Sequence, residues 1–113
     1  MAFRRFLFNR EDRDMGHILE NVVFLELLHR GYKVSVGKIG AYEVDFVAQA
    51  LNENLEYYQV SQSILDKNTF EREIQSLDKI DDHHPKCLLS MDYSDLSYKG
   101  IKHINILDWL MGG

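Results

Sequence analysis

The hydrophobic period of this chain changes sharply at Gly31. Before it, apolar residues recur three and four positions apart, which predicts one helix from Met15 buried on more than one side. Gly31 itself supplies the left-handed conformation common just past a last helical turn. After it the period shortens to two, in β-favouring runs at 32–39 and 42–48 separated by Gly40-Ala41. This pattern predicts an antiparallel hairpin.

Alternation within the second run separates its side chains into two sets. Asp45 falls with Glu43 and Val47, and therefore points away from the more apolar face, which holds Tyr42, Val44, Phe46 and Ala48. The turn-prone residues 52–54 lead into a third strand at 55–64, which we expect to pair with the second.

The second half of the chain predicts a crossover. Residues 66–69 offer several N-caps, with Asn68 and Glu71 approximating a capping box, and Phe70, Ile74 and Leu77 form one apolar helical face. We expect this helix to end near 83–85 and strands to follow at 86–92 and 101–107, before a helical turn at 108–110. Right-handed crossovers make strands three and four parallel. The predicted fold is α/β (α+β): an αβββαβ core, one mixed sheet flanked by helices, and one extra C-terminal strand.

Length and composition limit the organisation and the class of protein. The 113 residues suffice for one domain, which we assign to 15–113, with the aromatic and arginine-rich residues 1–14 as a lead-in from a missing N-terminal region. The lone Cys87 forms no intramolecular disulfide and suits a reducing compartment, so we expect a cytoplasmic protein. No run of about 18 apolar residues occurs, so no membrane span is expected. The net charge of −5 predicts weak binding to duplex DNA.

Several strings, spread over 15–110, occur in a fixed order. They are Gly16-His17-Ile18-Leu19-Glu20-Asn21, Val36-Gly37-Lys38-Ile39, Glu43-Val44-Asp45-Phe46-Val47, Tyr58-Gln59-Val60-Ser61, Arg72-Glu73 and Gly100-Ile101-Lys102-His103-Ile104-Asn105-Ile106. As a set they resemble the C-terminal domain of unknown function that follows the ATP-binding core in a group of prokaryotic AAA+-type ATPases. That domain is itself similar to the PD-(D/E)XK (restriction-endonuclease-like) nuclease superfamily. The phosphate-binding Gly-x-x-x-x-Gly-Lys-Ser/Thr string does not occur in this chain, so ATP would be bound elsewhere.

The resemblance implies a site of four residues. In the superfamily an acid on the first helix, an aspartate on the second strand and a Glu-x-Lys on the third gather around Mg²⁺, whose ligands are carboxylate oxygens. Those roles fall on Glu20, Asp45, Gln59 and Ser61, with Glu20 and Asp45 as the metal ligands. Gln59 and Ser61 carry no charge, so the resemblance implies a degenerate site without a cofactor. Mg²⁺ is expected only if a nuclease survives through migrated residues such as Glu73 or Lys79.

Plainer roles stay open for the same residues. Glu20 also fits a solvent-facing acid, Asp45 a structural hydrogen bond, and Gln59 with Ser61 ordinary polar positions in a strand. Three functions follow: an accessory module contacting the ATPase core of a parent protein or, weakly, DNA; a Mg²⁺-dependent nuclease; and a docking or homo-oligomerisation unit. An exposed apolar surface on the first helix would favour the third.

Other residues with chemical potential have plainer interpretations. We expect the adjacent His83 and His84 side chains to diverge and to lie at the surface. Cys87 is expected to be a small buried hydrophobe, and His103 a strand residue with a hydrogen-bond partner.

Overall fold

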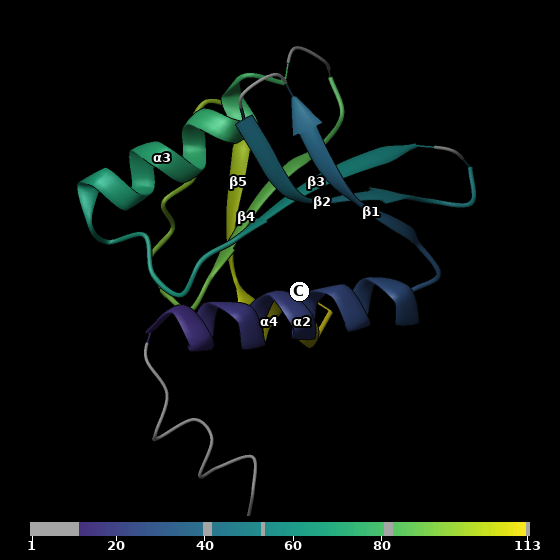
Figure 1. Cartoon of the computed structure of the whole chain (residues 1–113), viewed down its shortest axis with the longest axis horizontal. Helices are drawn as coiled ribbons and strands as arrows, with labels where there is room; N and C mark the ends of the chain where they lie inside the picture. The colour runs from purple at the N-terminus through teal and green to yellow at the C-terminus, as the bar shows by residue number, and fades with distance from the viewer. Residues whose placement is uncertain (1–11, 40–41, 53, 81–82, 113) are drawn as a thin grey trace, which may run out of the picture.

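The chain folds as one five-stranded sheet with helices on both faces (Figure 1). The computed structural model describes residues 12–39, 42–52, 54–80 and 83–112. Its elements are α2 (Asp12–His29), β1 (Lys33–Ile39), β2 (Tyr42–Gln49), β3 (Leu55–Val60), α3 (Lys67–Asp78), β4 (Lys86–Ser90), β5 (Ile101–Asn105) and α4 (Ile106–Leu110). This succession confirms the predicted α/β fold with its extra C-terminal strand. Helix α2 begins at Asp12, three residues before the predicted start at Met15, and the first 11 residues of the expected lead-in lie outside the described residues.

The sheet is mixed, in the spatial order β1-β2-β3-β4-β5. β1, β2 and β3 pair antiparallel, whereas β3 with β4 and β4 with β5 pair parallel, which confirms the meander and the predicted crossover. The expected turn at Gly40-Ala41 lies outside the described residues. Parallel strands end at the same edge of a sheet. The segments that follow β3, β4 and β5 therefore gather at one edge.

Helix α2 buries one stripe against the sheet and leaves its other side exposed. Leu19, Val23 and Leu27, spaced at four residues, pack in a core with Phe46 and with α4. Leu25 and Leu28, in contrast, are 55% and 45% exposed. The prediction of burial on more than one side is therefore wrong within the described residues. Gly31 ends the helix at a φ of 92°, as predicted.

A β-bulge in β2 breaks the strict alternation expected there. Ser35 pairs with Val47 and Gly37 with Val44, so two steps along β1 oppose three along β2. Val44 consequently packs in the α3-side core, while Phe46 packs in the α2-side core, and the prediction that they share a face is wrong. Gly37 fits this irregular point because a Cβ atom there would lie 2.6 Å from Val47 Cγ2.

Helix α3 covers the opposite face of the sheet. Ile74 and Leu77 are buried in its core, as the amphipathic pattern predicted. Its N-cap is Asp66, whose carboxylate accepts a hydrogen bond from Thr69 N at 3.1 Å. Since Asp66 caps two residues earlier than Asn68, the predicted capping box with Glu71 does not form. The helix also ends at Asp78, short of the predicted 83–85.

Three strands are shorter than expected. β3 ends at Val60, β4 at Ser90 and β5 at Asn105, where α4 begins. Asn105 caps α4 by accepting from Asp108 N at 3.1 Å, which converts the end of the predicted strand into a helix start. The segments after β3 and β4 keep two backbone hydrogen bonds, from Ser61 N to Leu89 O at 2.9 Å and from Met91 N to Gln62 O at 3.1 Å. Side chains described below hold them further.

Candidate functional site

The β2–β3 ladder gives way to side-chain hydrogen bonds at Asp45 and Gln59. Regular pairing ends at Phe46 opposite Tyr58. Beyond it, Asp45 N donates to Gln59 Oε1 at 2.7 Å, and Val60 N donates to Asp45 Oδ2 at 2.8 Å. Each side chain thus satisfies a backbone N–H of the neighbouring strand. Asp45 and Gln59 are thereby fixed together, as the resemblance implied, and Asp45 makes the structural hydrogen bond of the alternative interpretation.

Gln59 also links the sheet to α3. Its Nε2 donates to Glu73 Oε2 at 2.8 Å, and the whole residue is only 4% exposed. The carbonyl oxygen of the amide therefore accepts from Asp45 N, and its amino group donates to the Glu73 carboxyl. A carboxylate at this position would lack the donor that Glu73 receives.

Glu73 is the most perturbed acid of this group. Burial, followed by the negative charges of Asp45 and Glu20, raises its pKa from 4.5 to about 7, although Arg72 and the hydrogen bond from Gln59 oppose the rise. Near neutral pH the group is therefore about half protonated. The negative charges of Glu20 and Asp45 therefore act on the Glu73 carboxyl.

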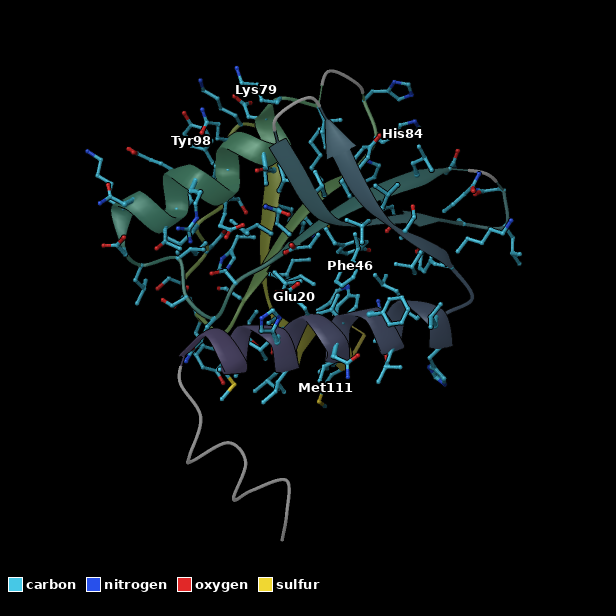
Figure 2. All side chains as sticks on the ribbon, in the orientation of Figure 1. Glu20, Phe46, Lys79, His84, Tyr98 and Met111 are labelled. Atoms are coloured by element: carbon cyan, nitrogen blue, oxygen red, sulfur yellow. The ribbon has the colours of Figure 1, made fainter. Side chains whose placement is uncertain are left out.

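Glu20 and Ser61 lie on the wall of a neighbouring cavity of about 590 Å³. Figure 2 shows Glu20 rising from α2 toward the sheet. Ser61 follows β3, and its hydroxyl donates to the Ser63 carbonyl oxygen at 3.0 Å. The remaining wall comes from α2, the 60–63 segment and the first turns of α3, including His17, Asp66, Thr69 and Arg72. The four predicted residues thus fall into a bonded pair, Asp45 with Gln59, and a cavity pair, Glu20 with Ser61.

A polar network at the ends of β4 and β5 anchors this cavity wall. Asp92 accepts from Ile64 N at 2.7 Å, from Ser63 Oγ at 2.9 Å and from Ser90 Oγ at 3.0 Å. Burial alone would raise the pKa of Asp92, but these hydrogen bonds hold it below its usual value. The fully buried Ser90 also bonds His103 Nε2 at 2.7 Å. Residues 61–64 therefore leave β3 along a fixed path.

Neither this network nor the role of Glu73 has a clear signal in the sequence. Asp92 lies in a segment that was predicted to be strand, and nothing in the spacing connects it to Ser63. The sequence offers Glu73 as an acid that could replace a lost catalytic residue. Its place beside Gln59, however, depends on how α3 crosses the sheet. Lys79, the other migrated candidate, forms the C-cap of α3.

Other histidines and the cysteine have structural environments. The His83 and His84 rings stack with centroids 4.9 Å apart, so the expectation that they diverge is wrong. His103 is buried and accepts a bond from Leu96 N at 3.2 Å, which confirms that it has hydrogen-bond partners. Cys87 is half-buried, and burial raises the pKa of its thiol to about 11. A thiol with this pKa is a poor nucleophile at neutral pH.

The donor set does not fit the Mg²⁺ that the resemblance would bring with it. Gln59 Oε1 and Asp45 Oδ2 each accept a backbone N–H, and Glu73 is only partly ionised near neutral pH. Ser61 offers no cation to support a nucleophile. Among the residues that the structure describes, no three His, Cys, Asp or Glu side chains form a group that could hold a metal ion.

Comparisons with known proteins place the chain beside one longer relative. It is 38% identical over 111 residues to a Haemophilus influenzae protein described as uncharacterized. The match covers 97% of this chain and 27% of the relative, so the chain spans about a quarter of that protein's length. No protein-family model matches, and no solved structure matches significantly. None of the described helices has the length and apolar character needed to cross a membrane.

Proposed function

We propose that this chain is a catalytically degenerate, nuclease-fold accessory domain, the C-terminal part of a cytoplasmic AAA+-type ATP-binding protein. In this role it mediates contacts with protein or nucleic acid and cuts neither strand of DNA. The proposal starts from the resemblance of the strings between 15 and 110. One observation carries the degeneracy: the Gln59 amide, at the position of an expected acid, accepts a hydrogen bond from Asp45 N and donates one to Glu73.

The engagement of Gln59 matters because a metal-dependent nuclease needs free anionic oxygens converging on its cation. Here hydrogen bonds tie β2 to β3 and β3 to α3 through the same side chains. Taking these oxygens for a cation would leave buried backbone donors unpaired, at a cost of about 1–3 kcal/mol each. The arrangement supports a structural role for residues at the positions that the resemblance marks as catalytic.

The charge and the length of the chain agree with an accessory role. A net charge of −5 gives little electrostatic attraction for phosphates, so any contact with DNA is expected to be weak. The relative extends well beyond the matched 27%, which leaves room for an ATP-binding core in such a protein. The partner that we expect first is that core.

A second candidate, a Mg²⁺-dependent nuclease with migrated residues, has one observation in its favour. Glu73 is a third carboxyl, linked to Asp45 through Gln59, and the charges of Asp45 and Glu20 contribute to its raised pKa. A cation bound there would favour the ionised form of Glu73 and would compensate the charge missing at Gln59.

A nuclease assay separates the two candidates. The isolated chain is incubated with supercoiled plasmid and with branched DNA in Mg²⁺ or Mn²⁺, beside the variants Asp45→Ala and Glu73→Gln. The accessory role predicts the same background level of DNA cleavage with the natural chain and both variants. Cleavage by the natural chain that disappears in both variants would establish the second candidate and refute the first.

A further inference from the structure

Helix α2 carries a second apolar stripe that faces away from the sheet. Ile18, Val22 and Leu25 recur at i, i+4 and i+7 and so share one side of the helix. Leu25 and its neighbour Leu28 are 55% and 45% exposed, whereas Ile18 and Val22 are half-buried. A helix apolar on two sides usually has two partners. Here the sheet covers one side.

Helix α4, which shares the buried core of α2, also has exposed apolar side chains. The Arg30 guanidinium, just past α2, lies 4.3 Å from the Trp109 ring centroid and donates to the Trp109 carbonyl oxygen, so the two helices touch. On α4, Leu107 and Met111 are 45% and 88% exposed. In Figure 2 Met111 lies below α2, on the side away from the sheet. We define the outer helical face as Ile18, Val22, Leu25, Leu28, Leu107 and Met111.

We infer that the outer helical face docks on another domain of the same, longer polypeptide. This inference rests on the proposed function and names its contact surface. The relative at 38% identity has 73% of its length outside the matched 27%, enough for such a domain. Tethering raises the effective concentration of the second domain, so a contact of modest area can persist.

The composition of the outer helical face favours an interdomain contact over a homodimer. His17, Asn21 and His29 are exposed beside the leucines, so the apolar stripe has polar flanks. Interfaces between domains of one chain are small and fairly polar, whereas obligate homodimer interfaces are larger and more hydrophobic. A second copy of this chain is therefore the less suitable occupant.

The test uses cysteine labelling in two contexts. One is the isolated 113-residue chain. The other is the same chain joined to the remainder of the H. influenzae relative, in place of the matched region. Leu25→Cys reports on the outer helical face, and Val36→Cys in β1, at a residue 72% exposed, is the matched control. A maleimide is added, and labelled peptides are quantified by mass spectrometry. The native Cys87 reacts slowly because its pKa is about 11.

We expect Leu25→Cys to react at least about tenfold more slowly in the fusion than in the isolated chain, with Val36→Cys unchanged. Equal reactivity of Leu25→Cys in both contexts would overturn the inference. So would protection in the isolated chain that grows with its concentration, because the occupant would then be a second copy. Circular dichroism and the unfolding midpoint verify that each variant folds. Asp45-dependent DNA cleavage would refute the degenerate site and leave the labelling result unaffected, so the two failures are distinguishable.

Discussion

The variant Glu73→Gln should change how the stability of this domain depends on pH. The pKa of Glu73 is raised in the folded chain from 4.5 to about 7. The folded state therefore holds this proton more tightly than the unfolded state, and stability falls as pH rises through that range. The stabilising effect of the protonated group is complete below about pH 4.5 and lost above about pH 7. The difference between the two pKa values corresponds to a loss of about 3 kcal/mol in the free energy of unfolding.

Glutamine removes this titration and keeps the local geometry. Its carbonyl oxygen can still accept the bond from Gln59 Nε2, which Glu73 accepts at 2.8 Å. We therefore expect Glu73→Gln to raise the free energy of unfolding by about 2–3 kcal/mol at pH 8 and to change it little at pH 4.5. Urea unfolding at half-unit pH steps measures the change in the free energy of unfolding across this range. Glu71→Gln, at an exposed residue of the same helix, is the control. A variant less stable than the natural chain at pH 8, or a gain in stability that is independent of pH, would show that the charge on Glu73 does not destabilise the fold.

Two further pairs of variants test the packing of α2 and the capping of α3. Leu27→Ala should lower the free energy of unfolding by about 2–5 kcal/mol, because Leu27 is fully buried. Leu25→Ala in the isolated chain should change it by less than about 0.5 kcal/mol, because Leu25 is exposed. Urea unfolding compares the two variants, and equal losses of stability would contradict the exposure of the outer helical face. Asp66→Ala should lower the free energy of unfolding by about 1 kcal/mol, because it removes the N-cap of α3. Lys67→Ala, at an exposed residue, is the control in the same measurement. Equal stability of the two variants would contradict the assignment of Asp66 as the N-cap.

The order of elements could be predicted from the sequence because each leaves a local signal. Gly31 marks the end of α2 through its positive φ, and the apolar positions 70, 74 and 77 mark α3. The exact ends could not be predicted where side chains compete with the backbone ladder. The β2–β3 ladder stops at Tyr58, beyond which the Asp45 carboxylate takes the Val60 N–H, and that hydrogen bond joins residues 15 positions apart.

The site could be predicted in part. Asp45 and Gln59 do bond to each other, and Glu20 and Ser61 share one cavity wall, but the strand alternation that placed Asp45 failed at the bulge between Val44 and Val47. A bulge depends on how two strands pair, and a single strand does not encode it. The contact of Gln59 with Glu73 likewise depends on where α3 crosses the sheet. The outer helical face is apolar in the sequence, but its exposure appears only once the sheet covers the other stripe.

We propose that the Asp45–Gln59–Glu73 group is structural and does not bind a catalytic cation. Calorimetric titration of Mn²⁺ into the natural chain and into Asp45→Ala tests it most directly. At pH 8 Glu73 is mostly ionised, which gives a cation its best opportunity to bind. We expect no saturable heat from either protein at millimolar Mn²⁺. A one-site isotherm from the natural chain that is lost in Asp45→Ala would show that Asp45 binds a cation.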